Sequence, residues 1–183
     1  MIKDALGYRH LVLGIIAIFL YVGVEVGIPG EMIFYLSKPV SEGGVLGSAA
    51  IAGTVAAMYW LLMLVGRLTS SFISGKVSTR TQIVTVCSVA LVLLLAAIFV
   101  PESETFSLPG SAESPVDLVI FQLTGGELPI KCLFLVLCGL CTSVMWGGIF
   151  NLATEGLGKY TAAASGLFMT MVVGGGALPL VQD

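Results

Sequence analysis

The sequence predicts an all-α fold, a polytopic membrane helix bundle, and three observations lead to that prediction. Only 10% of the 183 residues are charged, whereas soluble domains carry about 25%. The mean hydropathy is +1.04, and the apolar runs are each long enough to cross a bilayer core of roughly 30 Å. No run shows the alternating pattern of a membrane β-barrel, and lipid requires a spanning segment to pair its backbone groups internally. We therefore expect spanning helices.

The chain, 1–183, reads as one transmembrane domain with five spans. They cover residues 11–36, 48–74, 81–100, 131–153 and 162–181. The first run, Leu11 to Leu36, carries Glu25 and, near its end, Glu31 as its only charges. The second contains Arg67 inside the predicted helix. The shortest spans still cross the bilayer core, because an α-helix rises about 1.5 Å per residue.

Two further segments depart from plain spanning helices. The connection from Pro101 to Pro129, within loop 101–130, is rich in Ser, Pro, Gly and Glu. Its apolar stretch Leu118 to Leu123 is too short to span, so we expect an interfacial turn or strand there. The last run contains Gly174–Gly176 followed by Pro179, which predicts a helix that bends or breaks. Transporters use such irregular helices near their binding sites, although close helix packing explains the glycines equally well.

Lysine and arginine residues predict the orientation of the bundle, because cytoplasmic loops carry an excess of them. One side has five and the other has two: Lys3, Arg9, Lys76, Arg80 and Lys159 against Lys38 and Lys131. The acidic loop falls on the side with two. We therefore expect a cytoplasmic N-terminus, an extracellular loop 101–130 and, after five spans, a C-terminus outside.

Glu25 is the most informative residue of the chain. A carboxylate within a membrane span is costly, and it indicates a site that handles a polar solute or a proton. Glu25 lies 14 residues past Leu11, about 21 Å from the cytoplasmic side. Tyr21 lies one turn below it on the same face, near the midplane. A purely structural role for Glu25 is the alternative.

Polar and aromatic residues of two other spans reach a similar depth. Trp60 follows Tyr59 in the second span, and Thr142, Ser143 and Trp146 lie about 14–20 Å from the outer end of the fourth. Hydroxyls, a carboxylate and flat indole faces suit a sugar. The predicted substrate contacts are Tyr21, Glu25, Trp60, Thr142, Ser143 and Trp146. Alternatively, the tryptophans pack or face lipid, and the two hydroxyls bond carbonyls of their own helix.

Arg67 lies on a helix that runs the opposite way from the first. It is 19 residues past Ser48, only a few ångströms from the cytoplasmic surface. This depth predicts that Arg67 and Glu25 do not pair directly. We expect Arg67 to snorkel to the interface or to join Arg80 and Glu155 in a cytoplasmic clasp that stabilises one conformation.

Several function classes are disfavoured by the sequence. The net charge is −3 and there is no basic patch, so nucleic-acid binding is not expected. Cys138 and Cys141 form a CxxC inside a span, with no second CxxC and no nearby His, so we expect them to pack and predict no metal site. No nucleophile–base–orienter set and no phosphate-binding glycine loop is present, so neither an enzyme nor a cofactor is expected.

Three stretches of the sequence carry a resemblance to a known family. They are YVGVEVGIPG from Tyr21 to Gly30, VGRLTSSFISGKVSTR from Val65 to Arg80, and GLCTSVMWGGIFNLATEGLGKYTAAASGLFMTMVVGGGALPLVQD from Gly139 to Asp183. They resemble the seventh, the eighth, and the tenth and eleventh helices of the fucose:proton symporter family, a branch of the major facilitator superfamily that includes glucose/galactose transporters. The chain departs from the family pattern near Gly148, where a polar residue is common, and near Thr142, where Asn is frequent.

The resemblance implies a partial C-terminal half of a twelve-helix transporter, helices seven to eleven, in the inner membrane of a bacterium. The implied function is secondary active transport of a monosaccharide of the fucose, glucose or galactose type, coupled to protons by alternating access. The implied partners are the monosaccharide, the proton, the lipid bilayer and an N-terminal half of the transporter. Two alternatives stay open. One is a non-transporting fragment or membrane assembly module, and the other is an exporter of amphipathic compounds with a pocket rich in methionine.

Overall fold

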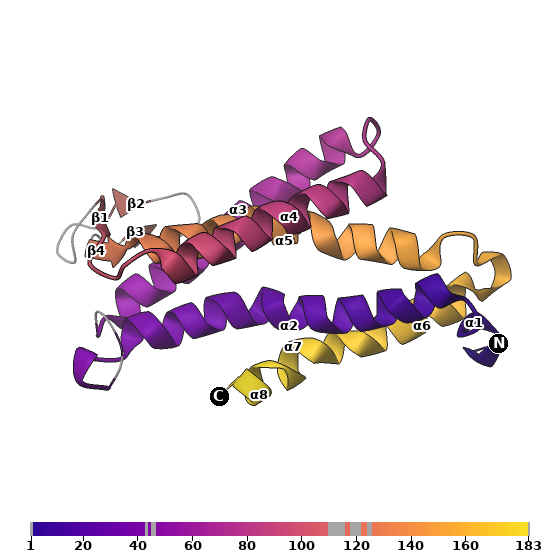
Figure 1. The fold of residues 1–183 in the computed structure, drawn as a ribbon, viewed down its shortest axis with the longest axis horizontal. Helices are drawn as coiled ribbons and strands as arrows, with labels where there is room; N and C mark the ends of the chain where they lie inside the picture. Colours follow the sequence, from indigo (N-terminus) through magenta and orange to yellow (C-terminus); the bar gives the residue numbers. More distant parts are fainter. Residues whose placement is uncertain are drawn as a thin grey trace.

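The computed structural model describes residues 2–42, 44, 47–109, 116–117, 122–123 and 126–182. Five helical segments in it are long and apolar enough to cross a membrane, which confirms the predicted all-α membrane bundle (Figure 1). The long helices are α2 (Arg9–Ser37), α3 (Ala49–Ile73), α4 (Thr79–Phe99) and α5 (Ile130–Thr154). The short ones are α1 (Ile2–Ala5), α6 (Thr161–Thr170), α7 (Gly174–Ala177) and α8 (Pro179–Gln182), with 3-10 turns η1 (Val40–Glu42), η2 (Gly158–Tyr160) and η3 (Met171–Val173).

Local sequence explains where the long helices begin and end. Ser48 and Ser78 each accept, through Oγ, a hydrogen bond from the backbone N–H three residues later, at 3.3 and 3.2 Å. These caps satisfy N–H groups that the first turn of a helix leaves without a partner. Helix α5 ends at Thr154, and Gly156 follows with φ of +72°, a left-handed conformation that favours glycine. The chain turns there and enters η2.

Helix α5 is the hub of the bundle and packs against α2, α3 and α4. Helix α2 also packs against α3 and against η3 and α7 (Figure 1). Small residues allow these close approaches. A Cβ at Gly139 would collide with the backbone of Tyr59 on α3, and one at Gly14 would collide with Ala153 on α5. The backbones of α2, α3 and α5 are therefore close enough for their polar side chains to meet.

Buried apolar side chains form two clusters along the bundle. One lies towards the loop that follows α4 and includes Leu36, Tyr59 and Val136. The other lies towards the N-terminus and includes Tyr21 and Phe168. The hydrogen-bonded side chains of the candidate site connect these two clusters, because they include Tyr21 from one and Tyr59 from the other.

The fifth spanning segment is not one continuous helix. It consists of α6, η3, α7 and α8 in succession, as the run Gly174–Gly176 and Pro179 predicted. Gly174 packs against the backbone of Phe19 on α2 with no room for a side chain. The irregular helix therefore lies directly against α2.

The connection between α4 and α5 contains strands. β1 (Thr105–Leu108) pairs antiparallel with β4 (Gly126–Pro129), and β2 (Val116–Asp117) pairs with β3 (Gln122–Leu123). Leu108 and Leu128 are buried in the first apolar cluster, so the β1–β4 ribbon covers the adjacent ends of α2, α3 and α5. Residues 122–123 of the predicted apolar stretch form β3, and residues 118–121 lie outside the described residues.

Candidate functional site

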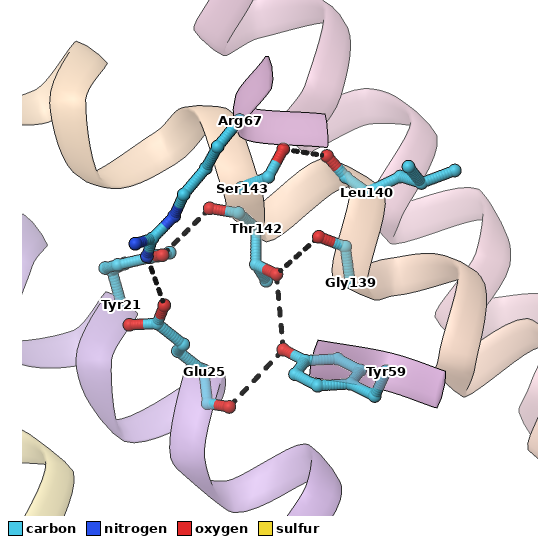
Figure 2. A network of polar contacts seen from close by, with 8 residues as sticks. All are labelled: Tyr21, Glu25, Tyr59, Arg67, Gly139, Leu140, Thr142 and Ser143. Atoms are coloured by element: carbon cyan, nitrogen blue, oxygen red, sulfur yellow. Dashed lines mark hydrogen bonds and ion pairs between the residues drawn. The ribbon is translucent and has the colours of Figure 1, made fainter. Parts of the chain in front are cut away.

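Five buried polar side chains from three helices come together inside the bundle. Tyr21 and Glu25 belong to α2, Tyr59 to α3, and Thr142 and Ser143 to α5. Figure 2 shows Glu25, Tyr59 and Thr142 facing one another between their helices. Glu25 is only 8% exposed and lies about 24 Å along α2 from its first residue, at about 1.5 Å per residue. The site is therefore deep within the apolar part of the bundle.

Hydrogen bonds link the three helices through Thr142. The Tyr21 hydroxyl donates to the Thr142 carbonyl at 2.8 Å. The Tyr59 hydroxyl lies 3.3 Å from the Glu25 backbone carbonyl and 3.2 Å from Thr142 Oγ1, which in turn lies 3.1 Å from the Gly139 carbonyl. These last three contacts share two hydroxyl protons, since a tyrosine and a threonine each have one to donate. The network can therefore adopt more than one arrangement of its hydrogens.

Arg67 forms an ion pair with Glu25, contrary to the sequence-based expectation. Arg67 Nη2 lies 3.3 Å from Glu25 Oε1, and Figure 2 shows the guanidinium reaching from α3 to the carboxylate. The prediction from depth was wrong because it assumed that all the helices end at the same height in the membrane. Figure 1 shows that α2 and α5 extend beyond the α3–α4 connection towards the N-terminus. The pair is asymmetric, because the Arg67 side chain is 53% exposed and the Glu25 side chain 10%.

A polar cavity of about 300 Å³ lies beside this ion pair, between α3, α4 and α5. Arg67, Ser143 and Trp146 line it together with two amides, Gln82 and Asn151. Trp146 also stacks on Phe150, with ring centroids 5.8 Å apart and planes inclined by 12°. The cavity therefore combines one charged group, several hydroxyls and amides, and an indole.

Five of the six predicted substrate contacts fall into two groups, and Trp60 belongs to neither. Tyr21, Glu25 and Thr142 form the buried network, and Ser143 and Trp146 line the cavity. Trp60 is 45% exposed and packs edge-on against Tyr59, with centroids 5.5 Å apart. Both hydroxyls on α5 also bond carbonyls of their own helix, Thr142 to Gly139 and Ser143 to Leu140, as the structural alternative expected.

Tyr59 is the network residue that sequence reasoning passed over in favour of Trp60. A signal for it was present in the chain. All but one of the buried residues of α3 lie on one helix face, which is rich in small residues. They are Ala52, Val55, Ala56, Tyr59, Met63 and Gly66, and Thr54 is the exception. Trp60 lies off this face. Choosing between two adjacent aromatics required the periodicity of the whole helix.

The three residues of the predicted cytoplasmic clasp are divided between two places. Arg67 pairs with Glu25. Arg80 and Glu155 both line a second cavity of about 550 Å³ at the ends of α4 and α5, next to Thr79 and Asn151. Within the described part of the chain, Arg67 forms no ion pair with Glu155.

The arrangement is suited to binding and proton exchange. A carboxylate held by an arginine can change its protonation or its partner when a solute or the helices move. Hydroxyl and amide groups can bond a polyol, and an indole can cover its C–H face. The described residues contain no group of three or more His, Cys, Asp or Glu side chains that could hold a metal ion.

Comparison with known proteins gives two sets of relatives. The chain is 31% identical over 175 residues to a glucose/galactose transporter of Brucella abortus, covering 96% of this chain and 35% of that protein. It is 28% identical over 180 residues to a putative glucose/galactose transporter of Helicobacter pylori, covering 98% of this chain and 37% of that protein. The chain thus spans about a third of the length of these curated relatives. No family model and no solved structure matches the chain.

Proposed function

We propose that this membrane protein transports a monosaccharide of the glucose, galactose or fucose type, as part of a larger transporter of the fucose:proton symporter family. In this proposal the chain provides helices seven to eleven of twelve, α2 to the segment that follows α5. Its similarity to proteins named glucose/galactose transporter supports the substrate class. The observation that carries the proposal is the ion pair of the buried Glu25 with the half-exposed Arg67 in a membrane bundle, beside a polar cavity.

The sugar contacts are proposed to lie around this ion pair. Ser143 and Trp146 border the polar cavity and offer a hydroxyl and an indole face. The contacts of Tyr21, Glu25 and Thr142 connect α2, α3 and α5 next to this cavity. Trp60, which lies outside the network, contributes only if it faces the part of the transporter that this chain does not include.

Proton coupling is proposed to act through Glu25. When Glu25 is ionised it attracts Arg67 across the α2–α3 contact, and when it is protonated that attraction is lost. The change alters the interaction between two helices of the bundle, which is what alternating access requires of a coupling residue. Arg80 and Glu155, on the walls of the second cavity, are the proposed cytoplasmic contacts that favour one conformation.

The proposed location is the inner membrane of a bacterium, with the N-terminus in the cytoplasm. The positively charged residues of the N-terminal end and of the α3–α4 and α5–α6 connections support this orientation. The strand-containing loop 101–130 then lies outside the cell. The partners in this proposal are the sugar, protons, the lipid bilayer and the N-terminal half of the transporter.

The test is uptake of radiolabelled glucose, galactose and fucose by cells that produce the native polypeptide containing this sequence. Glu25→Gln keeps the shape of the side chain and removes its charge, so we expect uptake to fall at least tenfold. Glu31→Gln is the matched control on the same helix, because Glu31 is exposed, and it should keep wild-type uptake. Wild-type uptake rates for Glu25→Gln from pH 5 to 8 would refute the role of Glu25, and no sugar uptake by the wild type would refute the proposed function.

A further inference from the structure

Two polar cavities lie end to end, the first between α3, α4 and α5 and the second between the ends of α4 and α5. The first, of about 300 Å³, borders the ion pair, and the second, of about 550 Å³, lies at the ends of α4 and α5. Thr79 and Asn151 are on the walls of both. The polar lining therefore continues from Arg67 to Arg80 and Glu155, without a purely apolar partition between the two spaces.

The unpaired donors of Arg67 favour water in the first polar cavity, which borders the ion pair and is called the inner cavity below. Within the described part of the chain, its ion pair with Glu25 uses one Nη2 donor, whereas a guanidinium carries five N–H donors. Donors left without a partner at membrane depth are costly, so such groups face a protein partner or a water-filled cavity. A volume of 300 Å³ accommodates on the order of ten water molecules, at roughly 30 Å³ each in the liquid.

A neighbouring cavity with an apolar lining provides a comparison. It has a similar volume, about 340 Å³, and lies on the other side of Ser70, Gln82 and Val144, which border both spaces. Its remaining lining is mostly aliphatic, including Ile73 and Leu140. An apolar cavity does not hold water stably. The two adjacent cavities are therefore similar in volume but differ in the polarity of their lining, which governs hydration.

We infer that the two polar cavities, whose lining includes the exposed Ser71 and Asn151, form one water-filled passage, which connects the Arg67–Glu25 pair to the aqueous phase at the N-terminal end. The residues that line the passage belong to α3, α4 and α5 or flank the ends of these helices. It gives the buried carboxylate contact with water on one side of the membrane. The inference concerns water alone and does not depend on the proposed sugar transport.

Two hydroxyl residues of α3 provide a matched pair of probes. Ser71 lines the inner polar cavity and Thr69 lines the apolar cavity. They lie two residues apart, and each donates to the carbonyl four residues earlier, at 3.0 and 2.8 Å. Ser71→Cys and Thr69→Cys therefore place a thiol at nearly the same depth with the same local backbone. Only the hydration of the adjoining cavity should differ.

The experiment uses a charged methanethiosulfonate reagent on the native polypeptide that contains this sequence, in membrane vesicles, with the labelled peptide quantified by mass spectrometry. This reagent reacts with a thiolate and stays in water, so we expect the Ser71→Cys thiol to be labelled at least tenfold faster than the Thr69→Cys thiol. Equal rates would overturn the inference. The native Cys138, which is 1% exposed, reports on folding in the same sample. If Cys138 is labelled in the Ser71→Cys variant, Asn151→Cys on α5 replaces that variant as the probe of the same cavity.

A plug variant tests the route itself. Gly147 lines the inner cavity, and a Cβ added there meets no atom within 4 Å. Gly147→Phe should therefore fill the cavity without disturbing the helices and should slow labelling of the probe thiol at least fivefold. Gly147→Ser, which leaves the cavity open, should not slow it. Unchanged labelling in Gly147→Phe would mean that water reaches the probe by another route, and the inferred passage would be wrong.

Discussion

Helices α2 and α4 are both strongly apolar and both long enough to span a membrane, yet they occupy opposite kinds of position. Half of the most apolar 18-residue window of α2 is buried in the bundle, against 6% of that of α4. In α4, all of whose residues the structure describes, only Ala97 is buried. Hydropathy therefore assigns both helices to the membrane without saying which one lies inside the protein.

Small and polar residues distinguish the two helices. Helix α2 has Gly14 against Ala153 of α5 and Gly23 against Leu178, and it also carries Glu25. Helix α4 lacks glycine and places aliphatic residues around most of its circumference. Because lipid is as apolar as leucine, helices associate in membranes through close packing and polar contacts. The difference between α2 and α4 makes this rule testable within one chain.

The largest effect is expected where a charge is placed on the exposed helix. Val89 lies at the middle of α4 and is 46% exposed. Val89→Asp should raise the apparent free energy of membrane insertion of this segment by about 2.5–3.5 kcal/mol, as measured for Asp at a helix centre. A microsomal insertion assay on the segment measures it, with Val89→Leu as the control. A cost below about 1 kcal/mol would mean that Val89 does not lie near the middle of the membrane.

The next largest effect is expected at a close contact between the buried helix and α5. Gly14→Leu introduces a side chain against Ala153, which forces α2 and α5 apart and should destabilise the fold by about 1–3 kcal/mol. Ser88→Leu on α4 is the control, because Ser88 is exposed and donates a hydrogen bond to the Val84 carbonyl of its own helix. Thermal unfolding of both variants in mild detergent gives the comparison. Equal stability of the two would refute the assignment of α2 as the interior helix.

A smaller effect distinguishes the two adjacent aromatics of α3. Tyr59→Phe removes the hydroxyl that contacts the Glu25 carbonyl and Thr142 Oγ1. Hydrogen bonds between membrane helices average about 0.6 kcal/mol, so we expect a loss of that size. Trp60→Phe should change the unfolding free energy less, because Trp60 is 45% exposed. Unfolding titrations in mixed micelles compare the two, and a larger loss for Trp60→Phe would contradict the observed network.

The sequence was sufficient for the membrane bundle and insufficient for the details of the site. Apolar run length predicts spanning helices because the bilayer thickness is fixed, and Gly174–Gly176 predicted the broken helix. The Glu25–Arg67 pair could not be predicted, since it depends on how far α3 and α4 fall short of the ends of α2 and α5 (Figure 1). Such offsets arise from packing between helices, which no single run of sequence encodes. The role of Tyr59 could have been predicted, because the small-residue face of α3 includes Tyr59 and excludes Trp60.

The smallest effect is expected where α4 connects to α2 outside the membrane. Glu102, three residues after α4 ends, accepts hydrogen bonds from Lys131 Nζ of α5 at 2.8 Å and from the Tyr35 hydroxyl of α2 at 2.9 Å. The hydrogen bond from Lys131, and then that from Tyr35, lowers the pKa of Glu102 below its ordinary value of 4.5. A carboxyl group whose pKa is lower in the folded protein stabilises it fully above that ordinary value, and this contribution disappears as the pH falls through the lowered pKa.

Glu102→Gln should therefore loosen the loop at pH 7 and make no difference at a pH below the lowered pKa. Amide hydrogen exchange of residues 101–108 measures this, with rates compared between variant and wild type at each pH so that intrinsic exchange cancels. Glu104→Gln, at an exposed neighbouring position, is the control. The effect is small because Glu102 is solvent-exposed and surface ion pairs contribute little, and 1 M salt should reduce it further. Identical exchange of wild type and Glu102→Gln at pH 7 would mean that the packing of Leu108 and Leu128 alone holds this end of α4 beside α2.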